Sequence, residues 1–412
     1  MSVIARRRVV LFGLFGFGNL GNEATLWVTL HHLWRRLPHA DIACVCDSVP
    51  AFAREYGVVG LPFDPMPVGG GRFIRPKSLQ LAYGVFATLI TEPIRRQRAI
   101  RMLANADQFV VVGTGVLDDL GEVPWGMPTQ IFRWVSAARA SRANVHLLAV
   151  GAGPIDNPIN RLLMTRAVAN AEVRSYRDDY SRGYMKRLGV WSKTDEVVPD
   201  LVFALPREWL PTSPSANSPP RVIGVGVMSY YGWNVGNARG REIYSTYVTR
   251  LAMFVRRLLN AGYHVRLLIG ERRTDAQTVR ELLEIIGPAE LSKIGERLIA
   301  SDMDCVDDVF REIALTDMVV ASRFHNLVFA LILGRPVVSL GYSAKFDALM
   351  QEMKLNRYCQ SIEDIDVDLL CEQVHHLSSH HADAVAAIAA RTDEYHQRLD
   401  RLYDSTFGAA QR

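Results

Sequence analysis

Short apolar runs recur along the chain, and between them apolar residues return at helical spacing. The runs are rich in Val, Ile and Leu, and the run over 318–321 lacks polar alternation, as in a strand that is buried on both faces. They cover residues 8–14, 42–46, 107–112, 145–150, 221–228, 263–270 and 318–321. Strands that alternate with helices in this way predict parallel sheets joined by helical crossovers.

The clearest of these β-α-β units occupies residues 317–345, DMVVASRFHNLVFALILGRPVVSLGYSAK. A strand is expected over 318–321, and Ser322 follows at the position of a helix N-cap. An apolar helix is expected over 324–333, where Gly334 ends it, and a second strand over 337–340. The two strands should therefore be parallel, with a right-handed connection.

Polar side chains interrupt this unit only where each strand ends. Arg323 and His325 stand at the first strand-to-helix turn, and Tyr342 and Lys345 follow the second strand. Open parallel sheets bind ligands beyond the carboxyl ends of their strands. Two cations, an imidazole and a helix N-terminus suit a small anion that must also exchange a proton. The alternative is that Arg323 and His325 only cap and pack the turn.

A glycine-rich turn, GFGNLGNEA, follows the first strand of the chain. Gly16, Gly18 and Gly21 match G-x-G-x-x-G, and Asp47 lies about where a ribose-binding acid is expected. This match permits a dinucleotide-binding oxidoreductase, but glycines serve any tight turn. A dinucleotide enzyme would also leave the Arg323 and His325 unit unexplained.

Other polar groups follow strands of the first half. Asn19, Asn22 and Glu23 offer amide and carboxylate groups to a polyol, although Asn22 or Glu23 could instead cap the helix. Asp118 follows a Gly-Thr-Gly turn, where it could bind sugar hydroxyls or cap the next element. Arg177 follows a short strand and should also lie on the ligand edge of its sheet.

Proline and serine dominate residues 206–220, PREWLPTSPSANSPP, and periodic patterning stops there. We therefore expect two doubly wound, Rossmann-like α/β domains that face each other across a cleft. The first covers 1–205 and should be the acceptor side. The second covers 221–380 and should be the donor side, and 381–412 should form a C-terminal helix that packs on the first domain.

Composition narrows the function classes. A net charge of +4 over 412 residues, without a recognisable DNA- or RNA-binding motif, argues against nucleic acid as a partner. Five scattered cysteines suit reduced thiols, and no set of residues has the spacing of a metal site. The sequence shows neither a signal peptide nor a membrane span, which predicts a cytoplasmic protein.

Residues 94–101 carry four arginines after an apolar stretch. A basic amphipathic surface of this kind can make a peripheral contact with anionic membrane. The alternative is a buried helix followed by a solvated one, broken at Pro93.

Taken in order, the motifs resemble those of the polysaccharide pyruvyl transferase family. The resemblance runs through GFGNLGNEA, VGTGVLDD, VGAGP, the R-D-x-x-S element at Arg177, PDLVF and SRFHN with GRPVVSLGYSAK. Two departures are Asn22, where the family often has Asp, and Thr114, where it often has a third glycine. The family is similar in fold to the two-domain GT-B glycosyltransferases, and its members transfer pyruvate from phosphoenolpyruvate to a sugar.

The resemblance implies roles for particular residues. Arg323, His325 and Arg177 match the family's donor-site residues and are the expected catalytic groups. Two guanidiniums suit the carboxylate and phosphate of phosphoenolpyruvate, and an imidazole suits the proton transfers. Tyr342 and Lys345 are further donor-binding candidates; the acceptor-binding candidates are Asn19, Asn22, Glu23 and Asp118.

Phosphoenolpyruvate is then a co-substrate, and no cofactor or metal is expected. The acceptor would be a sugar of a cell-surface polysaccharide or its lipid-linked precursor, and the product a ketal with release of phosphate. The leading alternative is a GT-B glycosyltransferase with a nucleotide-sugar donor. A third reading, a non-catalytic carbohydrate-binding protein, has little need of a proton-transfer group between two cations.

Overall fold

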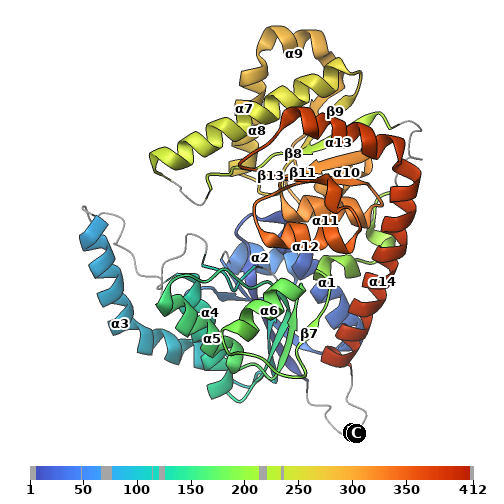
Figure 1. Cartoon of the computed structure of the whole chain (residues 1–412). Coiled ribbons are helices and arrows are strands. Elements are labelled where there is room, and N and C mark those ends of the chain that lie inside the picture. Colours follow the sequence, from blue (N-terminus) through green and yellow to red (C-terminus); the bar gives the residue numbers. More distant parts are fainter. Residues whose placement is uncertain are drawn as a thin grey trace. The chain divides into compact units, whose positions relative to one another are not determined.

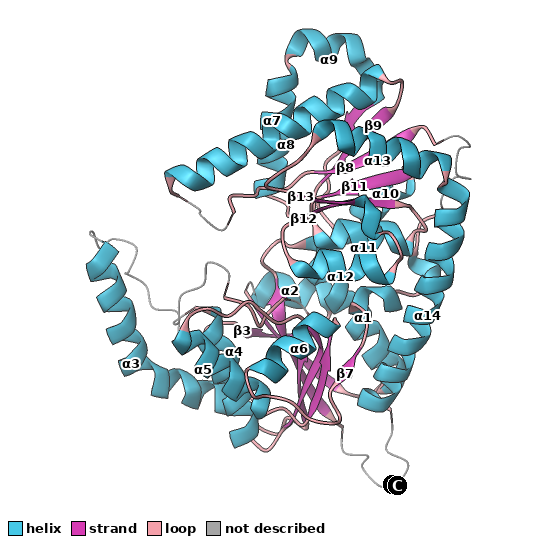
Figure 2. Cartoon of the chain, in the orientation of Figure 1, coloured by secondary structure: helices cyan, strands magenta, loops and turns pink. Residues whose placement is uncertain are grey.

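The computed structural model describes residues 6–47, 49–65, 77–113, 115–119, 126–212, 220–232 and 236–408, with residues 51 and 77–89 described by backbone alone. Strands and helices alternate along the chain, and the strands gather into two sheets (Figures 1 and 2). Among the described residues, no helix is both long enough and apolar enough to cross a bilayer.

The first sheet has the order β3-β2-β1-β4-β5-β6-β7, and all its described pairings are parallel. Its core includes Phe12, Phe109 and Trp134, which are at most 1% exposed. The helices α3, α4 and α5 pack side by side. The elements are β1 (Arg8–Phe15), α1 (Leu20–Arg36), β2 (Asp41–Cys46), α2 (Val49–Tyr56), β3 (Val59–Pro62), α3 (Lys77–Met102), β4 (Gln108–Val112), α4 (Met127–Ala140), β5 (Asn144–Val150), α5 (Pro158–Ala169), β6 (Val173–Tyr176), α6 (Asp179–Arg187) and β7 (Glu196–Val197).

The second sheet has the order β10-β9-β8-β11-β12-β13, again with parallel pairings throughout its described strands. The short helices η2 (Leu201–Ala204) and η3 (Arg207–Trp209) precede it. The other elements are β8 (Val222–Gly226), α7 (Ala238–Asn260), β9 (His264–Leu268), α8 (Thr274–Ile286), α9 (Pro288–Ile294), η4 (Gly295–Arg297), β10 (Leu298–Ala300), α10 (Val306–Ala314), β11 (Met318–Ala321), α11 (Phe324–Ile332), β12 (Val337–Gly341), α12 (Ala344–Glu352), η5 (Asn356–Tyr358), β13 (Cys359–Ser361), α13 (Val367–Ser379) and α14 (His381–Phe407).

The strand order reverses once in each sheet. In the first sheet the reversal lies between β1 and β4, and in the second between β8 and β11. Doubly wound sheets bind their ligands at this point, beyond the carboxyl ends of the strands. The two sheets confirm the Rossmann-like architecture that the sequence predicts, and the turn from β11 to α11 stands at the reversal of the second sheet.

The chain folds as two compact units. The first comprises Met1–Phe17, Thr25–Pro199 and Tyr403–Arg412, and the second Gly18–Ala24 and Asp200–Leu402. The first turn of α1 and the segment from Asp200 thus belong to the second unit. The predicted domain boundaries stay a prediction. The expected linker between the domains is the proline- and serine-rich segment 206–220, of which residues 213–219 lie outside the described residues.

One element differs clearly from expectation. The sequence favours a helix broken at Pro93, whereas α3 runs without interruption from Lys77 to Met102. A proline inside a helix removes one hydrogen bond and crowds the preceding turn, which kinks a helix more readily than it ends one.

Candidate functional site

The turn from β11 to α11 is fixed by a hydrogen bond to the buried Tyr247. The Tyr247 hydroxyl donates to Ser322 Oγ at 3.1 Å and accepts from the backbone N–H of Met228 at 3.1 Å. Burial raises the pKa of Tyr247 to about 12, so its hydroxyl stays protonated as a donor. Ser322 is therefore not the predicted helix cap. Because α11 begins at Phe324, Arg323 occupies the cap position, and its side chain makes no capping bond.

Arg323 forms a two-bond ion pair with Asp275. Its Nε lies 2.9 Å from Oδ2 and its Nη2 lies 2.5 Å from Oδ1. Asp275 is fully buried and also accepts backbone N–H bonds from Ser229, Gly270 and Glu271. Burial acts to lower the pKa of Arg323, but the Asp275 carboxylate outweighs it and raises that pKa. The guanidinium is thus permanently charged and rigidly oriented, and neither bond to Asp275 uses its Nη1.

His325 lies in the first turn of α11 with its ring closely packed. A Cβ placed on Gly21 would stand 1.9 Å from His325 Nδ1, so only glycine leaves room for the imidazole. The Phe324 ring meets the imidazole edge-on at 5.7 Å, and the Phe329 ring lies at 6.0 Å. On the other nitrogen, Nε2 lies 3.9 Å from Oδ2 of Asp200. The side chain is 14% exposed, which leaves it accessible yet well fixed.

The glycine-rich turn docks onto the loop that follows β9. Leu20 N donates to Gly270 O at 3.0 Å, and Arg272 N donates to Gly18 O at 3.3 Å. Asn19 Oδ1 accepts from the N–H groups of Gly21 and Asn22 at 3.0 and 3.3 Å, so Asn19 caps α1.

These contacts bear on the dinucleotide reading. A bound pyrophosphate needs the N–H groups at the start of the helix, yet Leu20 N is bonded to Gly270 and His325 lies on Gly21. Gly21 therefore serves close packing, while Gly16 and Gly18 take the positive φ angles, 81° and 86°, that the turn needs.

Lys345 stands in the first turn of α12, surrounded by aromatic rings. Its Nζ lies 5.1, 5.4 and 6.0 Å from the ring centroids of Tyr342, Phe324 and Phe346. Tyr230 stacks on Tyr342 at 5.6 Å. Cation–π contacts of this kind hold an ammonium in place without neutralising it. Phe324 thus connects Lys345 to the turn that carries Arg323 and His325.

The first unit holds the other candidates at its own sheet edge. Arg177 follows β6 and is 8% exposed. A Cβ on Gly151, which follows β5, would lie 2.4 Å from Arg177 Nη2 and 3.5 Å from the Cα of Gly115. Asp118 is near the same place, because its Oδ2 would lie 3.2 Å from a Cβ on Gly115. The carboxyl ends of β4, β5 and β6 thus bring Arg177 and Asp118 together around two glycines.

The neighbours of these residues have structural duties. Asp178 caps α6 through Ser181 N at 2.6 Å, and the Ser181 hydroxyl accepts from Ala152 N at 2.9 Å. Asp119 accepts from the N–H groups of Asp156 and Asn157 at 3.0 and 2.8 Å. The R-D-x-x-S element therefore fixes the loops around Arg177.

The second unit collects most of the predicted site. It contains Arg323, His325, Tyr342 and Lys345, and Asn19, Asn22 and Glu23 as well; Arg177 and Asp118 belong to the first unit. Asn22 and Glu23 are 5% and 3% exposed. Asp275 and Asp200 were not predicted as site residues from the sequence; Asp200 stands shortly after β7, and Asp275 lies in the first turn of α8.

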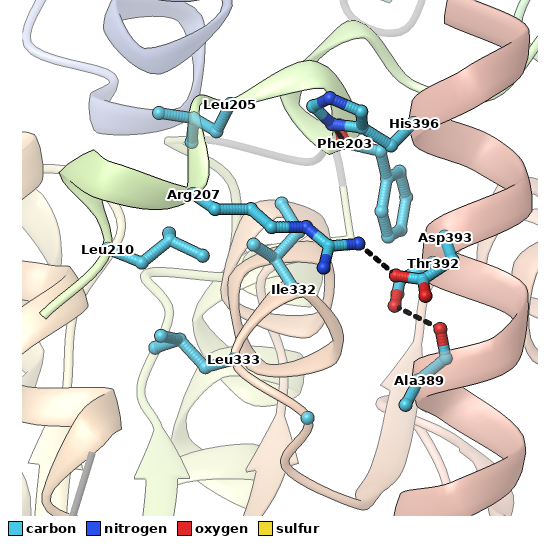
Figure 3. Close-up of a pocket in the computed structure, with 11 residues that line it drawn as sticks. Phe203, Leu205, Arg207, Leu210, Ile332, Leu333, Ala389, Thr392, Asp393 and His396 are labelled. Carbon is cyan, nitrogen blue, oxygen red and sulfur yellow. Dashed lines mark hydrogen bonds and ion pairs between the residues drawn. The ribbon is translucent and has the colours of Figure 1, made fainter. Parts of the chain in front are cut away.

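Two further observations limit the chemistry. Across the part of the chain that is described, no group of three or more His, Cys, Asp or Glu residues could hold a metal. A pocket of about 300 Å³ lies at the far end of α11 from His325, lined by Leu205, Ile332 and Leu333, with the Arg207–Asp393 ion pair beside it (Figure 3). This pocket contains none of the predicted site residues.

Comparison with known proteins identifies a family. The model of the family described as polysaccharide pyruvyl transferase matches residues 19–344. Among curated protein sequences, none matches the chain.

Solved structures that resemble the chain share its fold at low identity. The S. aureus MnaA–UDP structure has a TM-score of 0.62 and 10% identity, covering 97% of this chain and 96% of its own. The UDP-GlcNAc 2-epimerase of Neisseria meningitidis, bound to UDP-GlcNAc, has a TM-score of 0.58 and 10% identity, covering 97% and 99%. Anabaena HepE in complex with UDP-glucose has a TM-score of 0.59 and 12% identity, covering 97% and 98%. These likenesses show the two-domain GT-B type of fold.

Proposed function

Since the chain belongs to the polysaccharide pyruvyl transferase family, we propose that it transfers pyruvate from phosphoenolpyruvate to a saccharide as a ketal. The observation that carries the proposal is the turn from β11 to α11. It presents a rigid Arg323 beside a packed His325 at the reversal point of the second sheet, inside the matched range. A doubly anionic donor and a proton transfer need these two groups.

The donor carries a carboxylate and a phosphate, and the proposal assigns arginines to both. Arg323 offers a guanidinium whose pairing with Asp275 fixes its direction, and Arg177 supplies the second one. Lys345 adds a cation that its ring contacts, including the one with Tyr342, hold in place. Arginine suits such binding because its planar fork matches carboxylate and phosphate oxygens.

The reaction balances without an added cofactor. A proton transferred to the methylene carbon of phosphoenolpyruvate makes C3 a methyl group and C2 electrophilic. A sugar hydroxyl then bonds to C2 and loses its proton. A second hydroxyl of the same acceptor then bonds to C2 as the C2–O bond to the phosphate breaks, and its proton leaves with the phosphate, which closes the ketal. His325 is the group we assign to these proton transfers.

The acceptor is a saccharide, and we assign it Asn19, Asn22, Glu23 and Asp118. The two hydrogen bonds that cap α1 are accepted by Asn19 Oδ1, and neither of them involves the Nδ2 group of the same amide. A cell-surface polysaccharide or its lipid-linked precursor would suit this chemistry.

If the acceptor is lipid-linked, one face of α3 could place the protein at the membrane. Ile90 and Ile94 are 55% and 48% exposed, and Arg98 and Arg101 are exposed on the same helix. Such a face could bind anionic lipid at the inner side of the membrane. If so, the protein should sediment with phosphatidylglycerol vesicles at low salt, and the variant R98Q/R101Q should not; equal sedimentation of both would remove this part of the proposal.

The test is direct incubation with phosphoenolpyruvate and a panel of glycans. We expect release of inorganic phosphate together with a pyruvate-sized mass gain on one acceptor. His325→Gln should lower turnover by about 10²–10⁴-fold, the usual contribution of a positioned acid or base. Binding of UDP- or GDP-sugars without binding of phosphoenolpyruvate would favour a glycosyltransferase instead.

A further inference from the structure

Asp200 places a fixed carboxylate beside His325. Asp200 directly precedes η2, and its Oδ1 accepts from Val202 N at 3.1 Å. That bond holds the carboxyl group in one orientation, with Oδ2 at 3.9 Å from His325 Nε2. The Asp200 side chain is 3% exposed. A charge this well shielded from water acts more strongly on its neighbours than a surface charge does.

The imidazole is enclosed between this carboxylate and the first turn of α1. Nδ1 faces Gly21 and Nε2 faces Asp200, while the rings of Phe324 and Phe329 supply apolar contact. At 3.9 Å the contact with Asp200 is too long for a hydrogen bond, so charge attraction is its main component. Nε2 is therefore not held by Asp200 through a hydrogen bond.

We propose that Asp200 is the positioning residue of the reaction, orienting His325 and stabilising its imidazolium form. The idea rests on the proposed function, in which His325 gives a proton to the donor and needs to be charged beforehand. A carboxylate near an imidazole favours the protonated ring. The same residue would stabilise the positive ring again whenever the imidazole takes a proton back from a sugar hydroxyl.

Other charged groups surround the ring and limit the size of the effect. Glu23 lies two residues beyond Gly21 on the helix turn packed against the imidazole. Arg323 precedes it in the chain, and Asp275 balances that arginine. Phe324 and Phe329 carry no charge. A carboxylate at Glu23 would act in the same direction as Asp200, so removing Asp200 should weaken the imidazolium without abolishing it.

The test measures the imidazole itself, apart from turnover. The protein, labelled with ¹⁵N- and ¹³C-histidine, is titrated by NMR, and the His325 signals are identified by their loss in His325→Gln. Asp200→Asn keeps a good N-cap and removes the charge. We expect the titration midpoint of His325 to fall by about one pH unit. Asp366→Asn, which makes the same change at the cap of α13, should leave it in place.

The pH dependence of turnover gives a second measurement, which would not change if Asp200 had only a structural role. The pH profile of phosphate release should shift toward acid by the same amount in Asp200→Asn, and Asp200→Glu should restore it in part. Asp200→Ser provides another uncharged cap if the asparagine variant folds poorly.

An unchanged His325 midpoint in a folded, uncharged variant would overturn the proposal. Failure of the wild type to transfer pyruvate would instead refute the proposed function and leave the NMR result to decide on Asp200.

Discussion

Gly21 shows how much the site depends on a missing side chain. The sequence marks it as one glycine of a common turn motif, and only the fold reveals that His325 occupies the space where a Cβ would be. Sequence patterns predict strand ends well, because apolar runs and glycines define them locally. They do not predict which distant ring fills a local space.

We expect Gly21→Ala to remove activity while leaving the fold intact. The new Cβ would stand 1.9 Å from His325 Nδ1, so the ring must leave its present position. Turnover should fall by about 10²-fold or more, since a small misplacement of a reacting group has that effect. Gly183→Ala is the matched control, because its Cβ would meet nothing closer than 3.6 Å in α6. Wild-type turnover in Gly21→Ala would contradict the packing seen here.

The pairing of Arg323 predicts a large loss of stability in Asp275→Asn. That change leaves a largely buried guanidinium, 17% exposed, without its fully buried counter-ion, and breaking a buried pair costs about 3–5 kcal/mol. Asp364→Asn, which removes a surface partner of Arg250 at 3.1 Å, should cost less than about 1 kcal/mol. Urea unfolding measures both, and similar losses in the two variants would count against a structural role for the Asp275 pair.

At the scale of elements, the bounds of strands and helices could be predicted from the sequence more reliably than the residues that cap the helices. The strand over 318–321 is β11, and the helix expected over 324–333 is α11 within one residue. The end group was wrong, since Ser322 bonds to Tyr247 in α7 instead of capping α11. A serine hydroxyl can bond either to the first N–H groups of the helix that follows it or to another side chain. The Ser322 hydroxyl bonds to Tyr247, which lies in a helix far away in sequence.

The start of α8 gives an element-scale prediction about pH. Glu271 accepts hydrogen bonds from Arg273 N at 3.1 Å and Thr274 N at 2.7 Å. Burial raises the pKa of Glu271, but bonds from the Thr274 hydroxyl and from these N–H groups lower it more, so the net shift is downward. A lowered carboxyl pKa adds stability above the ordinary value of 4.5, and this stability is lost as the pH falls through the folded pKa.

Glu271→Gln should therefore be less stable than the wild type at neutral pH, with the difference shrinking below pH 4.5. Urea midpoints measured across pH give the result. Glu284→Gln, an exposed change in the same helix, serves as the control. If the difference in stability between the wild type and Glu271→Gln stayed constant with pH, the charge of Glu271 would not contribute to stability.

At the scale of the whole molecule, the sequence predicted two parallel sheets because each half repeats the strand-and-helix alternation. It did not predict that Gly18–Ala24 would join the second unit. Adjacency in the chain suggested the first half, whereas the hydrogen bonds of Leu20 and Gly18 go to the loop after β9. The acceptor candidates Asn19, Asn22 and Glu23 thus share a unit with Arg323 and His325.

A double-mutant cycle tests whether Arg177 and Arg323 both contribute to binding of the proposed donor. Arg177→Lys and Arg323→Lys keep the charge and lose the planar fork. If both guanidiniums bind the same phosphoenolpyruvate, the loss of affinity in the double variant should differ from the sum of the single losses by at least about 0.5 kcal/mol. Calorimetric titration measures the affinities, and strict additivity would indicate that the two arginines act independently.

The contact between Gly21 and His325 also orders events during synthesis. The ribosome makes the turn 18–24 early and the β11–α11 segment much later. The His325 ring can therefore pack against Gly21, the glycine wall of the imidazole, only when most of the chain has emerged. In a nascent chain released before that point, the proposed proton-transfer site would be incomplete. A fragment that starts at Asp200 would likewise lack the wall, and adding a peptide with the sequence of 16–36 in trans is the way to restore it.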